Sequence, residues 1–225
     1  MSELAAVLFD MDGTLVDTEI LWWDATEEIA ARIGHRLTDA DAPEVVGRAV
    51  EDTAAHLVRV TGTPDADGVA TALTAAFQER VDRGAPLRPG AGRLLAELAS
   101  EGVPFALVSA SPRSVVDSVI GGALAQVPFA FTLSADDTAR TKPHPDPYLA
   151  AAGRFGVPGE ACVAVEDSPD GAASAGAAGC VVLVVPSLLP VPARPGRIFA
   201  DSLEEVSLAG LRRWAADGGA AAGPV

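Results

Sequence analysis

The chain alternates short apolar runs with longer segments of helical spacing. Five of the runs are apolar at nearly every position: residues 5–9, 104–110, 129–135, 161–166 and 180–185. Runs of this kind are typical of strands that are buried on both faces of a parallel sheet. Segments with helical spacing, such as 91–102 and 146–157, lie between them and end near a glycine, as many helices do. The alternation predicts an α/β fold with a doubly wound parallel sheet.

One interval breaks the alternation and predicts an all-helical insertion. It contains no strand-like run, but helical spacing over residues 21–34, 51–62 and 68–84. We therefore expect a helical domain at 17–86, inserted between the two parts of a core domain formed by 1–16 and 87–216. The small residues of 217–225 predict a flexible tail.

Composition narrows the possible partners. The chain has 31 acidic and 16 basic residues and a net charge of −15, which argues against binding to nucleic acid or to an anionic membrane. Small phosphorylated substrates stay possible, because a metal ion and a few lysines set the field inside a pocket. The sequence has no apolar run of about 18 residues and no signal-peptide pattern, so we expect a cytoplasmic protein. Cys162 and Cys180 each begin an apolar run, and we interpret both as reduced core residues.

The first chemical motif is FDMDGTLVDTE, residues 9–19, at the end of the first predicted strand. Ligand sites in open α/β sheets lie beyond the carboxyl ends of the strands. Asp10 and Asp12 can converge there on one pocket, where a metal would keep Asp10 ionised while Asp12 exchanges a proton. The alternative is an acidic turn tightened by Gly13, which the buried strand before it and Thr14 after it make less favourable.

The second motif is LVSASPRS, residues 107–114, again at a strand end. Ser109 and the backbone amides that follow it, beginning with Ala110, can bind phosphate oxygens where a helix starts. Taken alone, Ser109 is better explained as a helix cap or turn residue.

The third motif is RTKPHPDPY, residues 140–148. Pro143 biases the preceding Lys142 towards an extended conformation and limits its movement. A lone lysine is usually a solvated surface charge, so this motif gains its meaning only from the others.

The fourth motif is VAVEDSPDG, residues 163–171. Glu166 and Asp167 end a very apolar run, where burial of two carboxylates is costly unless a cation compensates them. Ligands that are all oxygen indicate Mg²⁺ rather than a metal that prefers His or Cys. The alternative makes Asp167 or Ser168 a helix cap.

Together the four motifs resemble those of the haloacid dehalogenase-like (HAD) superfamily, in particular the branch of β-phosphoglucomutase and phosphoglycolate phosphatase. The resemblance covers about residues 5–185, and it implies a Rossmann-like core with a helical cap domain after the first motif. The dehalogenases of the superfamily usually lack the second acid of the first motif, which is present here as Asp12. The resemblance therefore favours phosphoryl transfer.

The resemblance also implies a role for each matching residue. Asp10 is expected to be the nucleophile that forms an aspartyl phosphate, and Asp12 the general acid and base. Mg²⁺ is expected to be held by Asp10, the backbone carbonyl of Asp12 and Asp167, with Glu166 close by or acting through water. The expected phosphate-binding and loop residues are Ser109, Ala110, Lys142, Gly13 and Thr14.

Phosphatase and mutase are harder to separate. The mutases carry a histidine in the first cap helix where this chain has Trp22, and their substrate-binding arginine motif is matched only loosely around Arg48. These departures favour a phosphatase (EC 3.1.3.-) that acts on a small phosphomonoester, with a sugar or polyol phosphate as the first choice. A β-phosphoglucomutase-type mutase is the alternative, and a non-catalytic binding protein is disfavoured because every catalytic position is intact.

Two residues of the predicted cap are candidates for contact with the substrate. Arg48 and Trp22 are the cap residues expected to contact substrate. A surface arginine at a helix start explains Arg48 nearly as well, and packing of the cap explains Trp22 slightly better. His35, His56 and His144 are scattered and show no metal-ligand spacing, so they are interpreted as solvated or structural. We expect a monomer.

Overall fold

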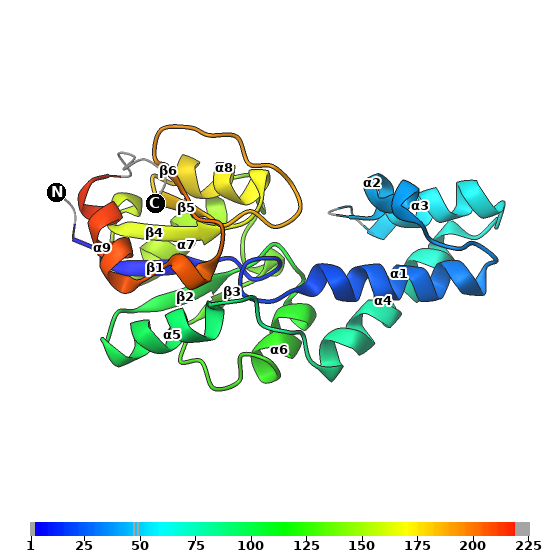
Figure 1. Cartoon of the computed structure of the whole chain (residues 1–225), viewed down its shortest axis with the longest axis horizontal. Coiled ribbons are helices and arrows are strands. Elements are labelled where there is room, and N and C mark those ends of the chain that lie inside the picture. Colours follow the sequence, from blue (N-terminus) through cyan, green and yellow to red (C-terminus); the bar gives the residue numbers. More distant parts are fainter. Residues whose placement is uncertain (1–2, 47, 49, 219–225) are drawn as a thin grey trace.

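A six-stranded parallel sheet forms the centre of the molecule. The computed structural model describes residues 3–218 except 47 and 49, and its sheet has the strand order β3-β2-β1-β4-β5-β6 (Figure 1). The strands are β1 (Ala6–Phe9), β2 (Phe105–Val108), β3 (Thr132–Leu133), β4 (Cys162–Glu166), β5 (Val181–Val184) and β6 (Arg197–Phe199). The predicted α/β fold with a doubly wound parallel sheet is confirmed.

Helices cover both faces of the sheet, which explains the continuous apolar runs. In β1, Val7 and Phe9 belong to one apolar cluster, and Ala6 and Leu8 belong to another on the opposite face. The first cluster includes residues of α5 (Ala91–Ser100), α6 (Arg113–Gly121) and α9 (Leu208–Ala216). The second includes residues of α7 (Asp146–Phe155) and α8 (Pro169–Ala177). Every position of the strand is therefore buried, and none is left for an alternating polar residue.

The prediction is wrong at the two edges of the sheet. The run 129–135 predicts a strand of seven residues, but β3 contains two. The residues before it are occupied in packing: Phe129 lies edge-on to Phe105, with ring centroids 5.2 Å apart. On the other edge β6 was not predicted, because three residues that begin with an arginine give no apolar run.

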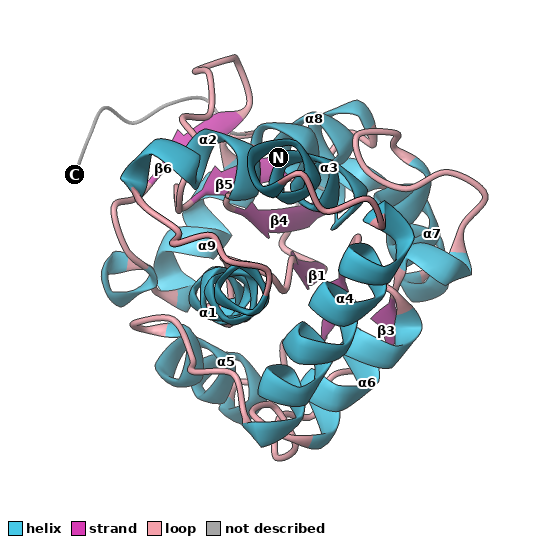
Figure 2. Cartoon of the chain, turned by 90° about the vertical axis from the view of Figure 1, so that its right-hand side faces the viewer, coloured by secondary structure: helices cyan, strands magenta, loops and turns pink. Residues whose placement is uncertain are grey.

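The interval predicted to be helical contains helices and no strand among its described residues. These are α1 (Thr18–Arg32), α2 (Ala42–Val45), α3 (Val50–Thr61) and α4 (Ala66–Arg83), with the short 3₁₀ helix η1 (Asp39–Asp41) before α2. Residues of α1, α3 and α4 form their own apolar cluster, which includes Ile29, Leu57 and Leu73. Figures 1 and 2 show these helices beyond the carboxyl ends of the strands. We propose that residues 17–86 form the cap.

Three observations complete the description of the chain. None of the helices in the described part of the chain combines the length and apolarity needed to cross a bilayer. Of the predicted tail 217–225, residues 219–225 lie outside the described residues. Cys162 and Cys180 are free and buried, as expected for core residues.

Two histidines that are far apart in the sequence meet at one buried aspartate of the cap. His35 Nε2 lies 3.1 Å and His56 Nε2 lies 2.8 Å from Asp41 Oδ1. Arg59 donates to His56 Nδ1 at 2.8 Å, and because a guanidinium only donates, His56 Nε2 carries the proton that faces Asp41. In this tautomer the one nitrogen lone pair of His56, on Nδ1, is engaged by Arg59 and is not free to bind a metal. The group is therefore a hydrogen-bonded link between η1, α3 and the chain after α1.

Asp41→Asn is expected to lower the free energy of unfolding by about 1–3 kcal/mol at pH 7, because buried donors lose a charged acceptor. Burial alone would raise the pKa of Asp41, but hydrogen bonds from His56, Thr38 and His35 outweigh it and hold the pKa well below its usual range. A lowered pKa stabilises the fold above the pKa of the unfolded chain, about 4, and this stabilisation is lost as the pH falls below it.

Urea unfolding at pH 7 and at pH 3 measures the effect of Asp41→Asn. The difference between the variant and the wild type should shrink at pH 3. Asp39→Asn is the matched control, because Asp39 belongs to the same short helix and is exposed. Equal losses of stability in the two variants would contradict the assignment of the effect to the buried carboxylate.

Candidate active site

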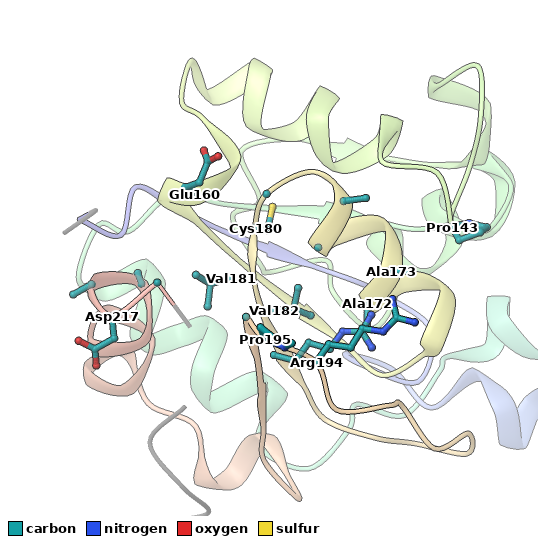
Figure 3. Close-up of a pocket in the computed structure, with 18 residues that line it drawn as sticks. Pro143, Glu160, Ala172, Ala173, Cys180, Val181, Val182, Arg194, Pro195 and Asp217 are labelled. Carbon is teal, nitrogen blue, oxygen red and sulfur yellow. The ribbon is translucent and has the colours of Figure 1, made fainter. Parts of the chain in front are cut away.

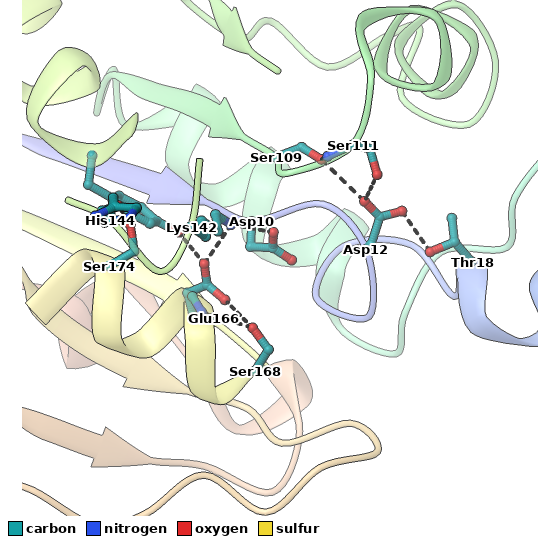
Figure 4. Close-up of polar contacts among 12 residues, drawn as sticks. Asp10, Asp12, Thr18, Ser109, Ser111, Lys142, His144, Glu166, Ser168 and Ser174 are labelled. Carbon is teal, nitrogen blue, oxygen red and sulfur yellow. Dashed lines mark hydrogen bonds and ion pairs between the residues drawn. The ribbon is translucent and has the colours of Figure 1, made fainter. Parts of the chain in front are cut away.

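Four chain segments meet at the carboxyl ends of the central strands. Asp10 directly follows β1, Ser109 follows β2, and Glu166 is the last residue of β4. Lys142 comes from the loop before α7. Because β1 lies between β2 and β4 in the sheet, these residues converge on one side of the molecule (Figure 4). The structure thus brings together the four motifs that the sequence separates.

Lys142 is the cationic centre of this group. Its Nζ donates to Asp10 Oδ1 and to Glu166 Oε1, both at 2.6 Å. Tyr148 Oη donates to the same oxygen of Glu166, whose side chain is 0% exposed. Burial acts to lower the pKa of Lys142, but the charges of Asp10 and Glu166 outweigh it and raise this pKa above its usual value. The amine therefore stays charged and fixes the nucleophile candidate in place.

Asp12 is held by hydroxyl groups. Its Oδ1 accepts from Thr18 at 2.7 Å, and its Oδ2 accepts from Ser111 at 2.7 Å and from Ser109 at 3.2 Å (Figure 4). Burial and the charge of Asp10 raise the pKa of Asp12, while the three hydroxyls act in the opposite direction. A carboxyl with a raised pKa is suited to give and take a proton near neutral pH.

Three carboxylates form a group that fits a divalent cation. One oxygen each of Asp10, Glu166 and Asp167 lies within 4.8 Å of the others. Asp10 Oδ2 is buried and has no hydrogen-bond partner among the described residues, so it can serve as a ligand atom. Burial, together with the charges of Asp10 and Glu166, raises the pKa of Asp167 to about 8. A hard cation with oxygen ligands would relieve this repulsion, and Mg²⁺ is such a cation.

Gly13 allows this arrangement. Its backbone has a φ of +78°, and a Cβ at this position would lie 2.2 Å from Asp167 Oδ2. Only glycine combines the left-handed backbone with so close an approach. The side chain of Asp12 does not belong to the cluster formed by Asp10, Glu166 and Asp167. Only the backbone carbonyl of Asp12 therefore stays predicted as a metal ligand.

Of the other predicted site residues, three line cavities and one does not. Ala110 and Arg48 line a cavity of about 490 Å³ together with Asp10, Asp12, Lys142 and Asp167. Trp22 and Arg48 line an adjoining cavity of about 530 Å³. Thr14 is buried, its hydroxyl has no partner among the described residues, and it lines neither cavity. Its predicted contact with substrate is therefore not supported by its position.

Several residues of the site were not singled out from the sequence, among them Thr18, Glu19, Ser111 and Tyr148. All four lie within the quoted motifs. For Thr18, Glu19 and Ser111 the signal was a motif that follows a strand end, whereas Tyr148 lies in α7. Their directions depend on how the loops turn, which periodicity does not predict. Tyr148 in particular looks like an ordinary core residue of α7, and only its contact with Glu166 reveals its polar role.

A larger cavity lies away from this chemistry. Its volume is about 860 Å³, and small residues of α8 and β5 line it together with Arg194 and Arg197 (Figure 3). Asp10, Asp12 and Asp167 do not contribute to it. The candidate active site is therefore assigned by its charged groups and not by the size of the cavity.

Comparison with known proteins agrees with this geometry. The sequence model of the haloacid dehalogenase-like hydrolase family matches residues 4–179. The chain therefore belongs to the haloacid dehalogenase-like hydrolases, as the four motifs predicted.

Several relatives carry names that describe a phosphatase activity. The chain is 36% identical over 189 residues to a probable pseudouridine-5'-phosphatase of Drosophila melanogaster, and the match covers 80% of each chain. It is 30% identical over 188 residues to hexitol phosphatase B of Escherichia coli (strain K12), with 82% of this chain and 85% of that protein covered. The predicted class, a phosphoric monoester hydrolase of the HAD type, agrees with both names.

A solved structure has the same fold. A variant of CbbY from Rhodobacter sphaeroides, crystallised with xylulose-(1,5)bisphosphate, is 28% identical and superposes with a TM-score of 0.74. The superposition covers 92% of this chain and 99% of that chain.

Proposed function

We propose that this protein is a Mg²⁺-dependent phosphatase that hydrolyses a small phosphomonoester, with a sugar or polyol phosphate as the first choice, through an aspartyl phosphate on Asp10. One observation carries the proposal. The carboxylate of Asp10 is fixed by Lys142 through one oxygen, its other oxygen has no hydrogen-bond partner in the described part of the chain, and the raised pKa of Asp12 provides a proton donor beside it. The names of the phosphatase relatives support the same class of substrate.

The reaction would proceed in two steps. A carboxylate oxygen of Asp10 attacks phosphorus, the bond from phosphorus to the leaving oxygen breaks, and Asp12 gives its proton to that oxygen. Asp12 then takes a proton from a water molecule as this water attacks the aspartyl phosphate, so that inorganic phosphate leaves and Asp10 is restored. Throughout both steps the Lys142 ammonium lies beside the oxygens of the phosphoryl group and reduces their repulsion from the carboxylates.

Asp10 and Asp167 would hold the Mg²⁺, with the backbone carbonyl of Asp12 as a further ligand. Glu166 belongs to the same cluster of three carboxylates, but its Oε1 already accepts hydrogen bonds from Lys142 and Tyr148, so it would lie close to the ion or act through water. When bound, the ion supplies positive charge that neutralises phosphoryl oxygens and orients them for in-line attack.

The mutase alternative gains no support from the cap. The indole nitrogen of Trp22 donates to the carbonyl of Val45 at 2.9 Å, and the ring packs edge-on against Phe77. Its polar atom is therefore not available to a substrate, in contrast to the histidine that the mutase pattern requires.

The deciding experiment measures release of inorganic phosphate with Mg²⁺ and with EDTA. The panel contains sugar, polyol and nucleoside monophosphates, and β-glucose 1-phosphate with a bisphosphate primer and a coupled assay for glucose 6-phosphate. Phosphate release that requires Mg²⁺ would support the proposal and identify the substrate class. Formation of glucose 6-phosphate without net phosphate release would establish a mutase instead.

Asp167→Asn is expected to raise the Mg²⁺ concentration for half-maximal activity by at least about tenfold, because a charged ligand is lost. Asp170→Asn is the matched control, since Asp170 lines the same cavity but does not belong to the cluster of three carboxylates that would bind the metal. A titration of phosphate release against Mg²⁺ compares the two variants. Equal shifts in both would mean that only the general charge of the cavity matters.

A further inference from the structure

The cap-side cavity of about 530 Å³ lies where the leaving group of the substrate must sit. The cavity of about 490 Å³ at Asp10 and Lys142 is called the phosphate cavity. The two cavities share the lining residues Asp12, Glu19, Arg48, Ala110 and Ser111. Asp10, Lys142 and Asp167 line the phosphate cavity only. Since Asp12 protonates the leaving oxygen in the proposed reaction, the carbon skeleton of the substrate extends from Asp12 into the cap-side cavity.

This cavity is acidic. Besides Asp12 it is lined by the carboxylates of Glu19 and Glu51, and Arg48 is the one cationic side chain among its described lining residues. Glu19 lies in the first turn of α1 and Glu51 in the first turn of α3. Acidic residues there also stabilise a helix, but Asp52 has the same effect on α3 without lining the cavity. Helix stability alone therefore does not explain why Glu51 faces this space.

The rest of the wall is mainly apolar. Trp22 and Phe77 pack against each other edge-on at 5.6 Å, and Pro112 and Val115 lie on the core side. The hydrogen bond from Trp22 to Val45 holds the indole in place. An apolar wall with a few carboxylates suits an uncharged carbon skeleton that carries hydroxyl groups, which can donate hydrogen bonds to an acid such as Glu51.

We propose that Glu19 and Glu51 make this site selective for monophosphate esters with an uncharged leaving group and exclude sugar bisphosphates. The inference rests on the proposed function and narrows its substrate class. A second phosphate in the cavity would bring about two negative charges close to two carboxylates, with one arginine to offset them. The structurally similar CbbY variant holds a bisphosphate, so this chain would differ from it in specificity.

The test compares kcat/KM for glucose 6-phosphate and glucose 1,6-bisphosphate, or for whichever sugar monophosphate is hydrolysed best and its bisphosphate. The wild type should prefer the monophosphate by at least about tenfold, and Glu51→Gln should reduce this preference about threefold or more. The double variant with Glu19→Gln should reduce it further. The preference should also fall as salt is raised, because salt screens the charges.

Asp52→Asn is the matched control, because it removes the same charge from the same helical turn outside the cavity. Its preference should equal that of the wild type. A wild type that accepts the bisphosphate as well as the monophosphate would overturn the inference, and so would an unchanged preference in the double variant. Circular dichroism checks that each variant is folded.

The proposed function can fail separately. If the wild type releases phosphate from no monophosphate, the phosphatase assignment is wrong. Calorimetric binding of the same two sugar phosphates then decides the selectivity. Tighter binding of the monophosphate that weakens in the double variant supports the inference, and equal or tighter binding of the bisphosphate overturns it.

Discussion

Asp10→Asn is expected to lower kcat for phosphate release by more than about 10⁴-fold, because an amide does not attack phosphorus and forms no aspartyl phosphate. The fold should survive the change. Asparagine has nearly the same shape, and its side-chain oxygen can still accept the hydrogen bond from Lys142. Measurements of kcat and of the thermal midpoint of unfolding separate the loss of chemistry from a loss of structure.

The control for this variant is Asp17→Asn. Asp17 carries the same charge in the same loop but pairs with Arg88 at 3.5 Å, away from the carboxylate group. Its kcat should stay within a few-fold of the wild type. Turnover that persists in Asp10→Asn would show that another group is the nucleophile.

Lys142→Met should have the largest effect on stability. The change leaves the buried Glu166 and Asp10 without their shared cation, and removing one partner of a buried ion pair typically costs about 3–5 kcal/mol of unfolding free energy. We also expect kcat to fall by at least about 10²–10³-fold, since the phosphoryl oxygens lose a neutralising charge. Added Mg²⁺ should restore part of the stability of the variant, because the ion replaces some of the missing positive charge.

Urea unfolding with and without Mg²⁺ tests this expectation. Arg140→Met is the matched control: Arg140 lies two residues earlier and forms an exposed ion pair with Asp146. Its stability should change little. If Lys142→Met were as stable as this control, the lysine would not be the cation that balances the buried carboxylates.

The sequence predicted the centre of the fold better than its margins. The strands β1, β2, β4 and β5 coincide with continuous apolar runs, because both faces of a central strand are covered by helices. The edge strands β3 and β6 have one neighbour each and contain two and three residues. Such short segments leave no periodic signal, so one was predicted too long and the other was missed.

The site could be predicted as far as its residues follow a strand end. Asp10 and Ser109 directly follow β1 and β2, Glu166 is the last residue of β4, and the topology of a parallel sheet brings such positions together. The hydroxyl partners of Asp12 could not be predicted in the same way. Which of several neighbouring serines and threonines points at a carboxylate depends on the turn of the loop and on the rotamer.

Contacts across the cap were beyond the reach of sequence patterns. His35, Asp41 and His56 show no spacing that relates them, yet they share one hydrogen-bonded group. The acidic character of the cap-side cavity also could not be predicted from spacing. Glu19 and Glu51 lie at the starts of two different helices, and only the packing of these helices makes both line one cavity.

The short edge strands of the sheet have a consequence for the behaviour of the protein in concentrated solution. A long, open strand edge offers a row of free amide and carbonyl groups to which another chain can add. Here the edge strands β3 and β6 contain two and three residues, so few backbone groups at the sheet edges are available for pairing with another chain. With a net charge of −15 repelling neighbouring copies, a chain that is 49% hydrophobic should resist strand-mediated aggregation as long as it stays folded.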